Sequence, residues 1–142
     1  MQPIIVPGKL ESLEKIGKFI MLAAEKAGLE RSRAYKLRLA VDEIATNIIN
    51  YGYLRSGVDG EITLNADIDE RALTITLDDT AEFFDPIAKT PPTADAFTQP
   101  LEERNNGGWG VYLAIQSVDQ FRYQRLQDHN QNIFVVYRAA AS

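Results

Sequence analysis

Three short polar segments, far apart along the chain, carry the side chains that could do chemistry. The first is VDEIATNIINYGY (41–53), in which Glu43 and Asn47 are four residues apart. In a helix this spacing puts both side chains on one face, one turn apart. A carboxylate can orient a water or a hydroxyl, and an amide oxygen can bind a hard cation such as Mg²⁺. A solvated helix face explains the same letters, so both interpretations stay open.

The second segment is LDDTAEFFDP (77–86), in which Asp78 and Asp79 end an alternating pattern typical of a strand. The chain leaves the sheet there, and open-sheet proteins often bind ligands at such strand ends. A carboxylate held at this point can accept a hydrogen bond from the amino group of a base. Aspartates that only form a turn would give the same pattern.

The third segment is NNGGWGVYLA (105–114), which has three glycines in four residues at the start of a helical pattern. Gly107, Gly108 and Gly110 would let the backbone approach a ligand and leave free N–H groups at a helix N-terminus, where a phosphate is stabilised. The segment is not a P-loop, because it lacks Gly-Lys-Ser/Thr and follows a long loop rather than a strand. A hinge that only packs tightly is the alternative.

The hydrophobic periodicity predicts the elements that position these segments. Residues 2–8 favour an edge strand, and residues 10–29 form an amphipathic helix that stops at Gly28. A second helix starts near residue 30, with Ser32 as a possible cap, and ends at Gly52. Residues 61–69 and 70–79 alternate as a hairpin. A third helix spans 107–118, and two strands (119–126 and 132–138) flank an exposed turn containing His129.

Residues 86–106 contain four prolines and no sustained period, so we expect a long loop that acts as a lid or binding segment. The order of elements predicts one domain over 1–142. Its fold would be an α+β two-layer sandwich, with a mixed, mostly antiparallel sheet covered on one face by helices.

Composition excludes several classes of function. The net charge of −5 argues against nucleic acid as a partner, because binding a nucleic-acid backbone needs a basic face that displaces counterions. The absence of cysteine removes disulfides, thiolate nucleophiles and Cys-type zinc sites, and one histidine excludes a His-clustered metal site. No window approaches the roughly 20 apolar residues of a membrane span, and the N-terminus lacks a signal-like pattern. We therefore expect a cytoplasmic protein without membrane contact.

Taken together and in this order, the three segments resemble the boxes of the GHKL ATPases, specifically the branch of anti-sigma factors and serine-protein kinases, whose ATP-binding domain is called the Bergerat fold. VDEIATNIINYGY is similar to the N box and LDDTAEFFDP to the first glycine box. The segment EERNNGGWGVYLAIQSVDQFRY resembles the second glycine box. The likeness covers nearly all 142 residues.

The resemblance implies a role for each matching residue. Glu43 would prepare the attacking hydroxyl, Asn47 would hold Mg²⁺, and Asp79 would bind the adenine amino group of ATP. An ATP lid at about 86–107 would end in the phosphate-binding residues, namely Arg104 for the terminal phosphate and the main-chain N–H groups of Gly107, Gly108 and Gly110.

Two positions depart from the family pattern. Ala81 stands two residues after the aspartate, where the family has glycine, and Tyr51 stands where the N box usually has histidine. If the backbone at Ala81 needs positive φ or a very close approach to adenine, the methyl group would weaken nucleotide binding. Tyr51 would change hydrogen bonding around the site. Neither change removes the proposed base or the metal ligand.

The resemblance implies a serine/threonine-protein kinase in a partner-switching pathway. It would phosphorylate a small STAS-type anti-sigma-factor antagonist, sequester a sigma factor when that partner is unavailable, and form a homodimer. A non-catalytic nucleotide-binding or protein-binding module with an altered ATP pocket is the alternative. An ATPase that drives conformational work is disfavoured, because the chain lacks the transducer domain of such relatives.

Overall fold

A computed structural model describes residues 1–54, 57, 59–81 and 109–139. Among these described residues, the N-terminal half contains strand β1 and three helical segments, and the rest contains four strands and one helix. In chain order the elements are β1 (Ile4–Pro7), α1 (Ser12–Ala27), α2 (Arg31–Asn47), the π-helix η1 (Ile48–Leu54), β2 (Glu61–Ile68), β3 (Ala72–Asp79), α4 (Trp109–Gln116), β4 (Gln120–Leu126) and β5 (His129–Tyr137).

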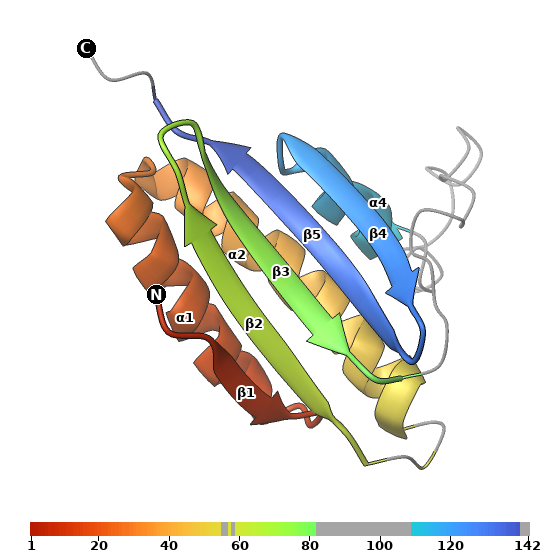
Figure 1. Cartoon of the computed structure of the whole chain (residues 1–142). Helices are drawn as coiled ribbons and strands as arrows, with labels where there is room; N and C mark the ends of the chain where they lie inside the picture. The colour runs from red at the N-terminus through yellow and green to blue at the C-terminus, as the bar shows by residue number, and fades with distance from the viewer. Residues whose placement is uncertain (55–56, 58, 82–108, 140–142) are drawn as a thin grey trace, which may run out of the picture.

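The five strands form one sheet in the order β1-β2-β3-β5-β4, and the helices cover one of its faces (Figure 1). This arrangement confirms the two-layer α+β sandwich. The sheet is antiparallel at each of its four pairings, whereas the sequence predicted a mixed, mostly antiparallel sheet. The reason is that β1 and β2, which are separated in the chain by the helices α1 and α2, also run in opposite directions.

Helix α1 forms where the periodicity predicted it. Ile16, Ile20 and Ala23 face the core at helical spacing and are fully buried. Gly28 ends the helix with φ 72°, a left-handed conformation in which its N–H returns to the last carbonyls of the helix. At the other end, the Ser12 hydroxyl donates to the Pro7 carbonyl at 2.7 Å, which ties the helix start to β1.

Helix α2 begins at Arg31 and changes geometry before it ends. Glu30 is its N-cap residue, so the prediction of a cap at Ser32 is wrong. The α-helix stops at Asn47 and continues as the π-helix η1, whereas the sequence predicted regular helix as far as Gly52. A π-turn bonds residues five apart, which lets both Ile48 and Tyr53 face the core. Such turns are rare and are often found at functional sites.

The hairpin of β2 and β3 confirms the alternation seen in the sequence. Ile62 pairs with Asp79 at one end and Ile68 with Leu73 at the other. The Asp69 carboxylate closes the turn by accepting the N–H groups of Arg71 at 2.7 Å and Ala72 at 2.8 Å. These hydrogen bonds lower the pKa of Asp69 below its ordinary value.

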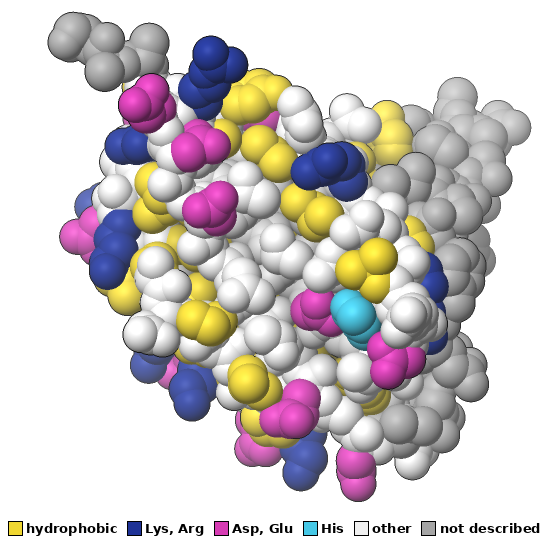
Figure 2. Space-filling view, viewed as in Figure 1, with side chains coloured by type: hydrophobic (Ala, Val, Ile, Leu, Met, Phe, Trp, Pro, Cys, Tyr) yellow, Lys and Arg dark blue, Asp and Glu magenta, His cyan; other side chains and the backbone are white. Residues whose placement is uncertain are grey.

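The last hairpin is tighter than the sequence indicated. Leu126 pairs directly with His129, so the turn contains only Gln127 and Asp128, and Gln127 adopts a left-handed φ of 47°. The prediction that His129 lies in an exposed turn is therefore wrong. It begins β5 and is half-buried, with its ring 3.7 Å from the Asp78 carboxylate. Figure 2 shows this histidine beside acidic side chains on the sheet face that the helices leave uncovered.

Helix α4 packs against α2, and its Val111 and Ala114 are buried against the core. The predicted lid at about 86–107 lies outside the described residues. Within the part of the chain that the structure describes, every helix is too short or too polar to cross a membrane.

Candidate functional site

The first two polar segments meet at one end of the sheet. A Cβ placed on Gly52 would lie only 2.6 Å from the Cβ of Ala81, so the two backbones approach each other there. Beside this contact, the Thr80 N–H donates to the Tyr53 hydroxyl at 3.0 Å. That hydroxyl donates in turn to the Glu61 carbonyl at 2.8 Å. The end of η1 is thus fixed against the end of β3, next to Asp79.

The third segment is described only in part. Gly110 lies in the first turn of α4, the helix that packs against α2. Arg104, Gly107 and Gly108 lie outside the described residues. The structure therefore places α4 against α2, and the end of η1 against the end of β3. The phosphate-binding roles of the glycines and of Arg104 stay predictions.

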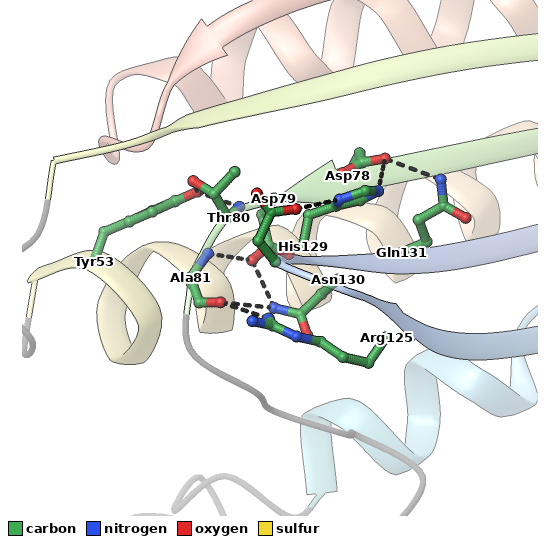
Figure 3. Close-up of polar contacts among 10 residues, drawn as sticks. Tyr53, Asp78, Asp79, Thr80, Ala81, Arg125, His129, Asn130 and Gln131 are labelled. Carbon is green, nitrogen blue, oxygen red and sulfur yellow. Dashed lines mark hydrogen bonds and ion pairs between the residues drawn. The ribbon is translucent and has the colours of Figure 1, made fainter.

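Asp79 is the most deeply buried carboxylate of the site, with 2% of its surface exposed. Its Oδ1 accepts the Ala81 N–H and the Asn130 amide, each at 3.0 Å (Figure 3). Its Oδ2 is buried and has no hydrogen-bond partner among the described residues. Because a buried acceptor without a donor costs free energy, this oxygen is well suited to the amino group of a ligand.

Burial governs the charge of Asp79. It raises the pKa of this carboxyl above the ordinary aspartate value, whereas the hydrogen bonds from Asn130 and Ala81 lower it. Asp78 raises the pKa further through its charge, and Arg125 lowers it. The net shift of the pKa is upward, so the charged carboxylate costs free energy in the folded protein. A ligand that donates a hydrogen bond to Oδ2 would offset this cost.

Ala81 fits its position without strain. Among the described residues other than glycine, only Gln127 has a positive φ, so the backbone at Ala81 does not require glycine. Its methyl group lies over Gly52, and its carbonyl accepts the Arg125 guanidinium at 2.9 Å and the Asn130 amide at 3.1 Å. The structure thus removes positive φ as a reason for weak nucleotide binding, while the effect of Ala81 on affinity stays a prediction.

Asn47 and Glu43 lie at the end of α2. Asn47 is 7% exposed, and its Nδ2 is buried without a partner in the described part of the chain. Glu43 is half-buried, and burial raises its pKa, with a further rise from the charge of neighbouring Asp42. A raised pKa makes a carboxylate a better acceptor for a hydroxyl proton.

The donor set suits a nucleotide-bound cation better than a protein-bound one. Among the described residues there is no group of three or more His, Cys, Asp or Glu side chains that could hold a metal ion. Mg²⁺ commonly takes few protein ligands together with substrate phosphates, and an asparagine amide oxygen can be one of these protein ligands. Asn47 fits this role, and its Nδ2, which has no partner within the described part of the chain, could donate to a phosphate oxygen. The binding of Mg²⁺ stays a prediction.

Sequence reasoning missed the residues that surround Asp79 from the last hairpin. Asn130 is 2% exposed, accepts the Tyr123 hydroxyl on its Oδ1, and contacts both Asp79 and Ala81. It was predicted to lie in a turn, whereas it belongs to β5. The available signal is the period of two, because Asn130, Asn132 and Phe134 all point to the helix-covered face.

The contact between Gly52 and Ala81 predicts a coupled pair. Gly52→Ala should lower the free energy of unfolding by about 1–3 kcal/mol through overpacking. In the double variant with Ala81→Gly, the loss should be smaller than the sum of the single losses by about 0.5–3 kcal/mol. Urea denaturation measures all four corners of the cycle. As a control, the losses from Gly52→Ala and from Ala24→Gly, in α1, should be additive. Coupling between Gly52 and Ala24, or the absence of coupling between Gly52 and Ala81, would contradict the packing.

The chain matches the histidine kinase-like ATPase domain over residues 6–136. No match was found among curated proteins. Since the family match spans nearly the whole chain and includes all three polar segments, the protein belongs to the histidine kinase-like ATPase domain family, whose members are nucleotide-binding domains.

Proposed function

We propose that this domain binds Mg-ATP and transfers the terminal phosphate to a serine or threonine of a small STAS-type anti-sigma-factor antagonist. One observation carries the nucleotide site: the buried Oδ2 of Asp79, which has no hydrogen-bond partner among the described residues, lies where the end of β3 meets the end of η1. The family match supports ATP as the nucleotide. The choice of a protein substrate rests on the resemblance of the boxes to the anti-sigma branch.

Each residue of the proposed site has a defined task. Asp79 accepts the amino group of the base through Oδ2. Asn47 would hold Mg²⁺, which when bound neutralises charge on the phosphates. Glu43 accepts the proton of the incoming serine or threonine hydroxyl, and the oxygen of that hydroxyl bonds to the terminal phosphorus. The bond from that phosphorus to the bridging oxygen breaks, and ADP leaves. Phosphoryl transfer depends chiefly on such positioning and charge.

The regulatory role extends this reaction to protein partners. We propose that the unphosphorylated antagonist and a sigma factor compete for the domain, which acts as a homodimer in the cytoplasm. The acidic net charge of −5 agrees with protein rather than nucleic-acid partners.

Calorimetry with ATP tests the proposal. The wild type should bind ATP more tightly with Mg²⁺ than without it, and Asn47→Ala should lose most of this difference. The control is Asn65→Ala, because Asn65 is exposed on β2 and should leave binding unchanged. The absence of ATP binding by the wild type would overturn the proposal.

A second measurement separates a kinase from a non-catalytic module. ATP labelled at the terminal phosphate should label a STAS-type antagonist when wild-type protein and Mg²⁺ are present. If ATP binds and antagonists associate but no label is transferred, the domain is a binding module and the kinase assignment is wrong.

A further inference from the structure

Asn130 occupies a position that links the last hairpin to the candidate base-binding carboxylate. It lies on β5 directly opposite Asp79 of β3. Its Nδ2 donates to Asp79 Oδ1 at 3.0 Å and to the Ala81 carbonyl at 3.1 Å, while its Oδ1 accepts the Tyr123 hydroxyl. Both polar atoms of this buried side chain are therefore engaged, and Figure 3 shows its amide between Asp79 and the Ala81 carbonyl.

Asp79 and the Ala81 carbonyl, both acceptors, determine which way the Asn130 amide faces, and Tyr123 supports that orientation. An amide can turn over, and the reversed amide would place its oxygen against the carboxylate oxygen of Asp79. The Tyr123 hydroxyl donates to the amide oxygen and so stabilises the observed orientation. Arg125, which lies on β4 with Tyr123, donates a hydrogen bond to the Ala81 carbonyl at 2.9 Å. The main chain that follows Asp79 is thereby anchored on β4 and β5.

This anchoring leaves the two oxygens of Asp79 unequal. Oδ1 has two donors, whereas Oδ2 is buried and unpaired within the described residues. We propose that Asn130 is a positioning residue that fixes the Asp79 carboxylate with Oδ2 toward the base and so sets a preference for 6-amino over 6-oxo purine nucleotides. The proposal rests on the proposed function, in which a nucleotide base binds at Asp79.

The chemistry of the purines explains the preference. Adenine carries an amino group at position 6, which can donate to a fixed carboxylate oxygen. Hypoxanthine carries a carbonyl oxygen there, which a fixed carboxylate repels, and an N–H at the neighbouring ring position. A carboxylate that is free to turn can follow that N–H, so loss of Asn130 should weaken the discrimination and not only the affinity.

The opposite face of the same strands offers a matched control. Gln131, the next residue of β5, donates to Asp78 Oδ2 at 2.9 Å, and Asp78 is the next residue of β3. This pair has the same chemistry as Asn130 and Asp79 but points away from the helices, where both side chains are half-buried. Gln131→Ala removes one amide–carboxylate hydrogen bond without touching the proposed site.

The test measures the affinities of ATP and of inosine triphosphate (ITP) by calorimetry on folded proteins. The wild type should prefer ATP, and Asn130→Ala should lower the ratio of the two affinities about tenfold, as expected for one hydrogen bond to a charged group. Tyr123→Phe should lower it in the same direction. Asn130→Ser, which keeps a donor, should restore part of the ratio, and Gln131→Ala should leave it unchanged.

Failure of this inference is distinguishable from failure of the proposed function. If the wild type binds neither nucleotide, the proposed function is overturned and this inference with it. If the wild type prefers ATP but Asn130→Ala lowers both affinities equally, Asn130 only supports the fold and the inference alone is wrong. Thermal unfolding checks each variant, and if Asn130→Ala does not fold, Asn130→Ser and Tyr123→Phe decide the outcome by the same ratio.

Discussion

Glu43→Gln is expected to slow phosphoryl transfer to the protein substrate by about 10²–10⁴-fold, the usual contribution of a positioned general base. Glutamine keeps the size of the side chain but cannot accept the hydroxyl proton. Because Glu43 acts on the hydroxyl and not on the nucleotide, the affinity for Mg-ATP should change little. Single-turnover transfer of labelled phosphate, with calorimetry of ATP alongside, measures the two quantities separately.

The pH dependence provides a second signature of Glu43. Burial and the charge of Asp42 raise its pKa above the ordinary glutamate value, and the base must be deprotonated to act. Transfer by the wild type should therefore increase as pH rises through that raised pKa, and Glu43→Gln should lack this increase. Glu25→Gln, on the exposed side of α1, should behave as wild type. Equal transfer by Glu43→Gln and wild type would remove Glu43 from its role.

The parts of the fold that local patterns control were predictable from the sequence. Ile16, Ile20 and Ala23 repeat at helical spacing before Gly28, and α1 forms there with its left-handed stop. The alternation of Ile62 and Leu64 gave β2 in the same way. In these segments the buried face alone specifies the element, so composition and period are sufficient.

Other features depend on contacts between distant segments and could not be read locally. The π-turn after Asn47 follows from the need to bury Ile48 and Tyr53 together against the sheet. The polar stretch QDHNQN (127–132) looks like a loop, yet residues 129–132 pair with β4 and residues 130–132 with β3, because the turn needs only Gln127 and Asp128. Strand propensity alone does not predict a strand whose first core-facing residues are asparagines.

For the candidate site, the sequence selects positions but does not indicate the hydrogen-bond network around them. Asp79 was selected because it ends a strand, and the structure places it beside the end of η1 through Gly52 and Ala81. Its partner Asn130 lies 51 residues away in sequence, so no local signal connects them. Spacing indicates which side chains share a helix face or a strand end, whereas the tertiary fold determines which atoms remain unpaired.

Asp79→Asn should weaken ATP binding by about 10- to 100-fold, since a hydrogen bond to a charged group contributes about 1.5–3 kcal/mol. Asparagine can keep one oxygen for the Ala81 N–H and the Asn130 amide, but it then presents an amide donor where Oδ2 was an acceptor. Two donors, from the amide and from the adenine amino group, would face each other. Asp78→Asn, one residue earlier on the opposite face, should retain binding.

The same substitution should stabilise the nucleotide-free protein at neutral pH. Because burial raises the pKa of Asp79, the folded state keeps this proton to higher pH than the unfolded chain, whose value is near 3.8. Stability from this group therefore falls as pH rises from 3.8 through the raised pKa, and above that pKa the buried charge opposes folding. Asp79→Asn should remove this fall and raise the melting temperature at pH 7, by about 2–4 °C for each kcal/mol regained. Melting temperatures of the wild type and the variant between pH 4 and 8 give the difference directly. If the variant is less stable than the wild type across that range, the Asp79 carboxylate stabilises the fold and is not an acceptor held at a cost for a ligand.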